Sequence, residues 1–111
     1  MKNRLIRIND EIKREISSLL QNGLKDPRMA KLATATRAEA SADLKHCKVY
    51  ISILGNDSEK ESSMIAINSA KGFIRSHIAK TLNLRQTPDL SFVLDDSAEY
   101  EQKISKILEQ L

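Results

Sequence analysis

The 111-residue sequence contains no tryptophan, four other aromatic residues, three glycines, two prolines and one cysteine. A single cysteine excludes an internal disulfide, and isolated glycines exclude the glycine-rich loops that cradle nucleotide phosphates. No apolar run approaches the roughly 20 residues of a membrane span, and the N-terminus lacks the pattern of a secretory signal peptide. We therefore expect a cytoplasmic protein with no membrane partner.

A chain of this length is expected to form a single domain over residues 1–111, with one modest core. The net charge is only +3, but its distribution is uneven: +5 over residues 1–50, +2 over 51–88 and −4 over 89–111. A basic body with an acidic C-terminal stretch indicates a polyanionic partner for the body. A charged surface that serves only solubility would give a similar pattern.

Helical periodicity predicts a first helix over residues 4–23, with Gly23 as its stop signal. Its apolar face consists of Leu5, Ile8, Ile12, Ile16, Leu19 and Leu20. Asp26 and Pro27 then predict a turn, because a residue before proline disfavours the helical conformation.

Alternating patterns predict strands over residues 33–40 and 46–54, joined by a hairpin at 41–45, and a third strand over 90–96. In the second strand the apolar side chains that share one face are Cys47, Val49, Ile51 and Ile53. The opposite face carries His46, Lys48, Tyr50 and Ser52.

Further helical patterns surround these strands. A helix from about Glu59 is predicted, with Ser58 as its N-cap and Glu61 completing a capping box. The pattern continues to Leu82 but is interrupted at Gly72, where a glycine costs about 1 kcal/mol relative to alanine. A last helix capped by Ser97 presents Tyr100, Ile104, Ile107, Leu108 and Leu111. Three strands are too few to close a barrel, so we expect a two-layer α+β sandwich with helices on one face.

Candidate catalytic and metal sites are poor. His46, Cys47 and His77 are the only soft ligands, and they lack paired-ligand spacing. Cys47 is interpreted as a small core residue, and the adjacent Asp95 and Asp96 as capping residues. We therefore expect neither an enzyme nor a metal or other cofactor.

Nucleic-acid binding is better supported. The first helix carries Arg4, Arg7 and Arg14 along one stripe, at spacings that place them on one side of the helix. A second basic cluster surrounds the interruption at Gly72, and it consists of Lys71, Arg75, Lys80 and Arg85. Lys45 and Lys48 extend the basic surface. Because Phe73 and Phe92 are interpreted as core, Tyr50 remains the one candidate for base stacking, and contacts to the RNA backbone are favoured.

Several of these stretches together resemble the ribosome-binding factor A family of small-subunit assembly proteins. The matching stretches are "RLIRI" in the first helix, "LKDPR", "DLKHCKVYISIL", "SAKGFIRSHIAKTLNLR" and "TPDLSFVLDDS". Their order and spacing are specific, and they span nearly the whole chain. Many members continue into a long charged tail, which this sequence lacks, and its acidic C-terminal stretch is not expected to contact RNA.

The resemblance implies a KH-like domain of the second type, in which an Ala-x-Gly motif joins two helices. Ala70, Lys71 and Gly72 match this motif. In this interpretation Gly72 forms the break and lets RNA backbone approach closely, while the helix that begins there directs its positive end toward phosphate. The alternative is that Gly72 only relieves crowding where two helices meet.

The implied function is non-enzymatic: binding to free 30S subunits and 16S rRNA late in assembly, assistance in rRNA maturation, and release before translation. The chain is expected to act as a monomer without a small-molecule substrate. The residues expected to contact RNA are Arg4, Arg7, Arg14, Arg28, Lys45, Lys48, Ala70, Lys71, Gly72, Arg75, Lys80 and Arg85. The main alternative is a protein–protein adaptor that uses the sheet face around Tyr50, whereas no residues support a small hydrolase.

Overall fold

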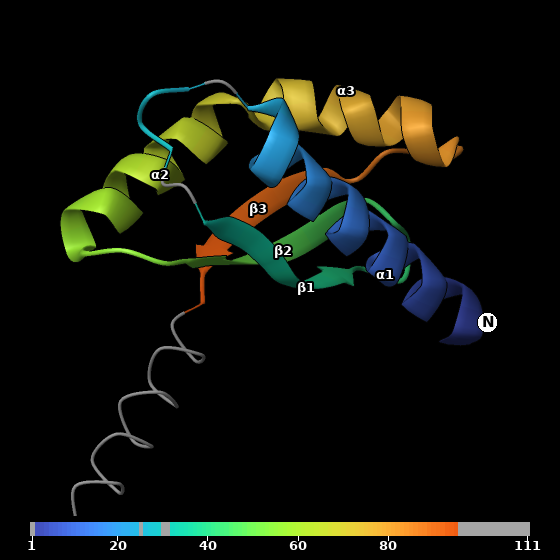
Figure 1. The fold of residues 1–111 in the computed structure, drawn as a ribbon. Coiled ribbons are helices and arrows are strands. Elements are labelled where there is room, and N and C mark those ends of the chain that lie inside the picture. Colours follow the sequence, from blue (N-terminus) through green and yellow to red (C-terminus); the bar gives the residue numbers. More distant parts are fainter. Residues whose placement is uncertain (1, 25, 30–31, 96–111) are drawn as a thin grey trace, which may run out of the picture.

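A computed structural model describes residues 2–24, 26–29 and 32–95, and the predicted last helix after Ser97 lies outside the described residues. The elements are α1 (Lys2–Ser18), η1 (Leu19–Gly23), β1 (Ala33–Ala40), β2 (His46–Ile53), α2 (Asp57–Ser69), α3 (Lys71–Leu82) and β3 (Asp89–Leu94). The three α-helices lie on one face of the sheet (Figure 1). This arrangement is the two-layer α+β sandwich that the sequence predicts.

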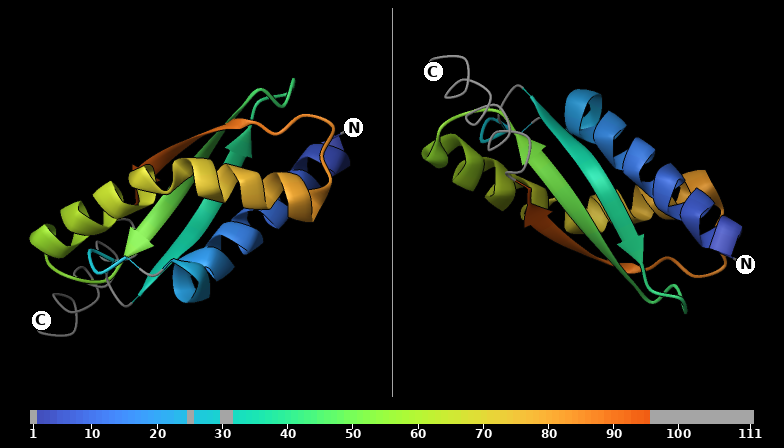
Figure 2. Two further views of the ribbon diagram at one scale, coloured as in Figure 1. Left: turned by 90° about the horizontal axis from the view of Figure 1, so that it is seen from above. Right: turned by 90° about the horizontal axis from the view of Figure 1, so that it is seen from below.

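The sheet has the strand order β1-β2-β3. β1 pairs antiparallel with β2 through the predicted hairpin, with a bulge at Thr36 between Ala35 and Arg37. β2 pairs parallel with β3, which requires a crossover connection. α2 and α3 form that connection and run along the sheet above β2 and β3 (Figure 2). The crossover therefore places the α2–α3 junction over the sheet.

The core lies between the sheet and the helices. The predicted inward face of β2 is confirmed, since Cys47, Val49, Ile51 and Ile53 are all at most 1% exposed. The fully buried isoleucines that the helices contribute are Ile12 and Ile16 from α1, Ile67 from α2, and Ile74 and Ile78 from α3. On the strand side of this layer the β-branched Val49, Ile51 and Ile53 also suit a β-strand.

α1 also holds the outer edge of β1. The Ala35 amide donates to Ser17 Oγ at 3.0 Å, and the Ala40 amide donates to Asn9 Oδ1 at 2.9 Å. After Ser18 the helix continues as one π-helical turn and ends at Gly23, as predicted. The Asp26–Pro27 turn is confirmed too, because the Met29 amide donates to the Asp26 carbonyl at 3.0 Å.

The predicted cap of the second helix is wrong by two residues. Asn56 is the N-cap of α2, and its side chain accepts from the Glu59 amide at 2.8 Å while Glu59 Oε1 accepts from the Asn56 amide at 3.2 Å. Gly55 allows this arrangement, because a Cβ there would lie only 3.1 Å from Glu59 side-chain atoms. Ser58 is therefore inside the helix rather than at its end. The third strand is also shifted slightly, since it runs over 89–94 and ends before Asp95.

Candidate nucleic-acid interface

The break between α2 and α3 lies at Ala70, not at Gly72 as predicted. Ala70 has φ −92° and ψ 7°, and its amide still donates to the Ala66 carbonyl at 3.1 Å. The Ile74 amide in turn donates to the Ala70 carbonyl at 2.9 Å. A single residue outside helical geometry is therefore enough to redirect the chain, and a positive φ at Gly72 is not needed for the turn.

Gly72 is the second residue of α3 and has right-handed helical backbone geometry. It is exposed, and a Cβ built there would meet nothing within 4 Å. Within the described residues no side chain caps this end of the helix. The first turn of α3 therefore carries unpaired amides and a partial positive charge, and it lies next to the partly negative C-terminal end of α2 at Ser69.

Lys71 lies directly beside this end of the helix. Its Nζ is 6.0 Å from the centroid of the Phe92 ring on β3, within cation–π distance. This contact directs the ammonium toward the β3 side of α3, while the side chain remains exposed. Lys71 therefore adds a formal charge next to the free amides of the junction.

Arg75, one turn further along α3, is committed to a structural role. Its Nη2 donates to the Thr87 carbonyl at 2.8 Å, and its Nε donates to the Pro88 carbonyl at 3.2 Å and lies 3.6 Å from an Asp89 carboxylate oxygen. The guanidinium thus fastens the loop before β3 to α3. Arg75 shapes the surface there and has less charge available for RNA than the sequence predicts.

A hollow follows α3 beside this arginine. Its lining consists of Gly72, Arg75, Ser76, Ala79 and Thr87. Gly72, Ser76 and Ala79 recur at spacings of four and three, so they occupy one side of the helix and leave its backbone accessible. Lys80 and Arg85 are exposed beyond the far end of the hollow. The residues predicted around Gly72 therefore lie along α3 and in the loop that follows it, and we call this region the α3 surface.

The arginine stripe of α1 is close to α3 but is not free of acidic neighbours. α1 and α3 contact each other, with His77 Nε2 3.5 Å from Glu15 Oε2. Arg14 forms an ion pair with Asp10, and its hydrogen bond to that carboxylate is the main reason that the pKa of Asp10 is lowered. Arg4 and Arg7 are exposed on the N-terminal half of α1.

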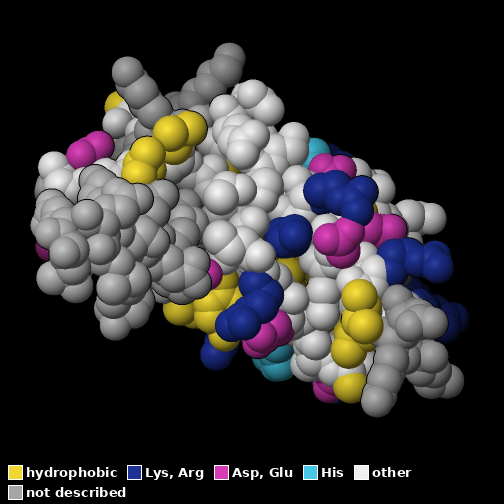
Figure 3. Space-filling view, turned by 60° about the horizontal axis from the view of Figure 1, so that its bottom comes forward, with side chains coloured by type: hydrophobic (Ala, Val, Ile, Leu, Met, Phe, Trp, Pro, Cys, Tyr) yellow, Lys and Arg dark blue, Asp and Glu magenta, His cyan; other side chains and the backbone are white. Residues whose placement is uncertain are grey.

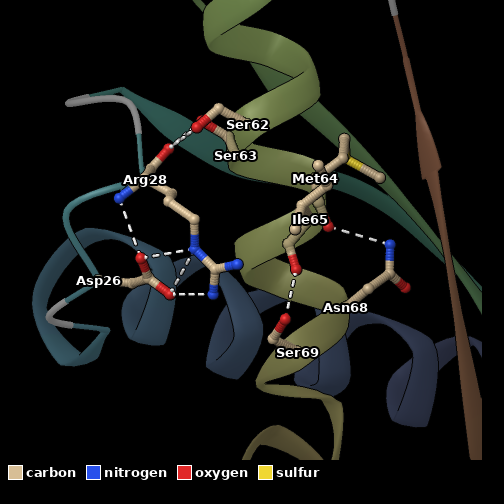
Figure 4. A network of polar contacts seen from close by, with 8 residues as sticks. All are labelled: Asp26, Arg28, Ser62, Ser63, Met64, Ile65, Asn68 and Ser69. Carbon is tan, nitrogen blue, oxygen red and sulfur yellow. Dashed lines mark hydrogen bonds and ion pairs between the residues drawn. The ribbon is translucent and has the colours of Figure 1, made fainter.

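Arg28 belongs to a structural network rather than to the α3 surface (Figure 4). Its Nη2 lies 2.7 Å from Asp26 Oδ2, and this pairing lowers the pKa of Asp26 to about 2. Its carbonyl accepts hydrogen bonds from the hydroxyls of Ser62 at 3.0 Å and Ser63 at 3.4 Å, which dock the turn on α2. The sequence gives no signal for this docking, because it joins segments more than 30 residues apart.

The open face of the sheet carries the remaining candidates. Lys48 is exposed there and is paired in register with Glu39, while Lys45 is exposed in the hairpin. The Arg37 guanidinium lies 4.1 Å from the centroid of the Tyr50 ring and 3.1 Å from Glu39. Basic and acidic side chains alternate on the coloured part of this face (Figure 3). Lys48 and the α3 surface therefore lie on opposite sides of the sheet.

Two aromatic assignments also differ from expectation. Phe73 is 57% exposed, whereas the sequence places it in the core. The buried stripe of α3 is Ile74 and Ile78, and Phe73 lies on the other side of the helix. Phe92 is partly buried and packs against the core, as predicted. Phe73 is therefore a solvent-exposed ring in the first turn of α3, whereas Tyr50 is only partly exposed.

Candidate metal ligands do not assemble in the described part of the chain. No cluster of three or more histidine, cysteine or acidic side chains within those residues could hold a metal ion. Cys47 is 1% exposed, and burial raises its thiol pKa to about 11, so it behaves as the predicted core residue. Of the described helices, none combines the length and hydrophobicity needed to cross a bilayer.

Comparison with known proteins agrees with this arrangement. Residues 4–108 match the family model of ribosome-binding factor A. The chain is 48% identical to ribosome-binding factor A of Caldicellulosiruptor bescii over 107 residues, which cover 95% of this chain and 81% of that protein. 

Solved structures of relatives show the same KH-like fold. A solution structure of a Thermotoga maritima ribosome-binding factor A superposes with a TM-score of 0.71 at 37% identity, over 81% of this chain and 85% of that one. A homology model of a Thermus thermophilus ribosome-binding factor A, fitted into a cryo-EM map of its complex with 30S subunits, has a TM-score of 0.67 at 24% identity, over 79% of this chain and 91% of that one. The chain belongs to the ribosome-binding factor A family.

Proposed function

We propose that this chain is a non-enzymatic assembly factor that binds RNA of the small ribosomal subunit through the α3 surface. In this role it binds free 30S subunits late in their assembly, assists maturation of 16S rRNA and leaves before translation. Membership of the family supports a role at the ribosome, and the Thermus relative fitted into a 30S complex supports the small subunit as the partner.

The observation that carries the proposal is the uncapped start of α3 beside Gly72. Free amides and the helix dipole favour a phosphate at this end. Gly72 has no side chain, so a ligand can reach the helix backbone there. The hollow lined by Ser76 and Ala79 extends this accessible stretch along the helix. The polyanionic backbone of RNA can therefore approach the helix more closely there than at any position with a side chain.

Part of the unpaired positive charge of the described residues lies at this site, and the rest is carried by Arg4, Arg7, Lys45 and Lys48. Lys71, Lys80 and Arg85 form no ion pair with a carboxylate of the described residues, whereas Arg14, Arg28 and Arg75 all do. Lys71 and Lys80 are nine residues apart on α3, about 13 Å along its axis. Nine residues correspond to about two and a half turns, so these two ammonium groups lie on opposite sides of α3, and an RNA segment that contacts both must cross the helix.

Co-sedimentation with purified 30S, 50S and 70S particles tests this function, repeated at increasing salt. The account predicts that the protein pellets with free 30S particles and is released steeply as salt rises, because each phosphate contact releases condensed counterions. Pelleting with 50S or 70S particles as strongly as with 30S, or binding that is insensitive to salt, would contradict it.

A protein–protein adaptor is the second candidate, and the open sheet face favours it. Tyr50 stacks under Arg37, and Val93 on the neighbouring strand is an exposed apolar residue at a position paired with Tyr50. The two side chains form a small apolar area on an otherwise charged face. Tyr50→Ala would abolish 30S pelleting in this second case and leave it unchanged if RNA binds the α3 surface.

A further inference from the structure

Phe73 is an exposed aromatic side chain that folding does not explain. More than half of its surface is exposed, while its neighbour Ile74 is fully buried. At an exposed helical position a phenylalanine does not stabilise the helix, because the helix propensity of phenylalanine is lower than that of alanine or lysine. We infer that Phe73 is a stacking platform for an unpaired RNA base, and this inference rests on the proposed function.

The position of Phe73 on α3 places it beside the hollow. With 3.6 residues per turn, successive side chains are rotated by about 100°. Starting from the buried stripe, Lys71 and Arg75 come first, then Gly72, Ser76 and Ala79, and then Phe73 and Lys80. Arg75 therefore lines the hollow on the β3 side, while Phe73 and Lys80 follow next around the helix, beyond the edge formed by Gly72 and Ser76.

The direction of the side chain strengthens this arrangement. Helical side chains lean toward the N-terminal end of their own helix, so the Phe73 ring covers the surface beside the α2–α3 junction. When a phosphate of the RNA binds at the start of α3, the base of the same nucleotide or of the adjacent one lies next to this ring. Lys80, two turns further on and on the same side, is about 10 Å along the axis and can meet a following phosphate.

The surroundings of Phe73 favour a base over a protein partner. Its helical neighbours three and four residues away are Ser69, Ala70, Ser76 and His77, and none is a large apolar residue. Protein docking surfaces are contiguous apolar patches of several hundred square ångströms. A single ring among small and polar groups, next to cations, is instead the arrangement by which proteins bind single-stranded nucleic acid.

A short single-stranded RNA, such as a twelve-nucleotide oligoadenylate, is the probe for this inference. Phe73→Leu keeps an apolar side chain but removes the aromatic face, and it should weaken binding about 5- to 100-fold, the effect of losing one stacked base. The dependence of affinity on salt should stay the same, because no phosphate contact is lost. Binding of duplex RNA should change little.

Phe73→Trp provides a direct readout, because the sequence contains no other tryptophan. Its fluorescence should be quenched as the oligonucleotide saturates. Ile6→Trp is the matched control: Ile6 is 64% exposed on α1, beside a hollow lined by Asn9, Asp10, Lys13 and Thr36, and its fluorescence should not respond.

Three results would overturn the inference. The first is Phe73→Leu binding the oligonucleotide like the unchanged protein, and the second is an unquenched Phe73→Trp at saturation. The third is weaker 30S binding by Phe73→Leu with unchanged oligonucleotide binding, which would mean that Phe73 contacts a protein of the subunit. In each case the unchanged protein still binds RNA, whereas failure of the unchanged protein to bind RNA would contradict the proposed function itself.

Discussion

Gly72 shows how a glycine can occupy a regular helix for reasons outside the folded chain. Its backbone is helical and the space around it is open, so alanine would fit without strain. A glycine there costs the folded protein roughly 0.5–1 kcal/mol relative to alanine. The interpretation that Gly72 relieves crowding between α2 and α3 is therefore not supported, whereas the open space agrees with the close approach of RNA that we propose.

We expect Gly72→Ala to stabilise the protein by up to about 1 kcal/mol, and at the same time to weaken 30S binding because the methyl group narrows the approach to the helix. The sequence alone suggested the opposite effect on stability, since it placed the helix break at this residue. Thermal unfolding paired with a 30S binding assay measures both effects.

Gly55→Ala is the matched comparison. A Cβ at Gly55 would lie 3.1 Å from two carbons of Glu59, and its φ of +157° is unusual for a residue with a side chain. This variant should lower the melting temperature and leave 30S affinity unchanged. If Gly72→Ala also lowered the melting temperature, the start of α3 would not be the regular helix described here.

The buried Cys47 thiol should make the free energy of unfolding depend on pH. Burial raises its pKa to about 11 from a usual value near 9, so above pH 9 the unfolded chain loses this proton while the folded protein retains it. The free energy of unfolding should therefore fall between pH 9 and 11. Chemical unfolding of Cys47→Ala and of the unchanged protein at several pH values measures this effect. The variant should lack this part of the decline. An identical slope in both proteins would contradict the buried thiol.

At the scale of elements, the start of α2 illustrates a limit of sequence patterns. A capping box requires an N-cap residue and an acidic or amide residue three positions later. Both Asn56 with Glu59 and Ser58 with Glu61 satisfy that spacing. In the structure Asn56 and Glu59 form the capping box, because the chain enters the helix at Asn56, directly after Gly55.

Two single substitutions separate these caps. Asn56→Ala should destabilise the protein by about 1 kcal/mol, the usual effect of losing an N-cap side chain. Ser58→Ala, inside the first turn of α2, should be nearly neutral or slightly stabilising, because alanine has the higher helix propensity. Urea unfolding of both variants measures the difference, and the reverse order of effects would place the cap at Ser58.

The elements that the sequence predicts best are those with local signals. The apolar face of α1 and the alternation in β2 follow directly from periodicity, and both are buried as predicted. The parallel pairing of β2 with β3 has no such signal, because it depends on where a 35-residue crossover returns the chain. The exposure of Phe73 could not be predicted for a related reason: phenylalanine is usually buried, and only the placement of Ile74 and Ile78 fixes which side of α3 faces the sheet.

At the scale of the whole molecule, the twelve predicted RNA contacts do not form one surface. Ala70, Lys71, Gly72, Lys80 and Arg85 surround α3, with Arg75 beside them holding the loop before β3. Arg4, Arg7 and Arg14 lie on α1, Arg28 is fixed by Asp26, and Lys48 lies on the opposite face of the sheet. Charge counted along a sequence shows neither which cations are paired, as Arg14, Arg28 and Arg75 are, nor on which face of the molecule the others lie.

The opposite placement of Lys71 and Lys48 provides the most direct test of the central claim. Lys71→Gln and Lys48→Gln remove the same charge from exposed positions on the two sides of the sheet. The measurement is the affinity of each variant for 30S subunits as a function of salt. The account predicts that Lys71→Gln weakens binding and reduces the salt slope by about 0.7 to 0.9, while Lys48→Gln changes neither. A loss of affinity and slope in Lys48→Gln with none in Lys71→Gln would contradict it.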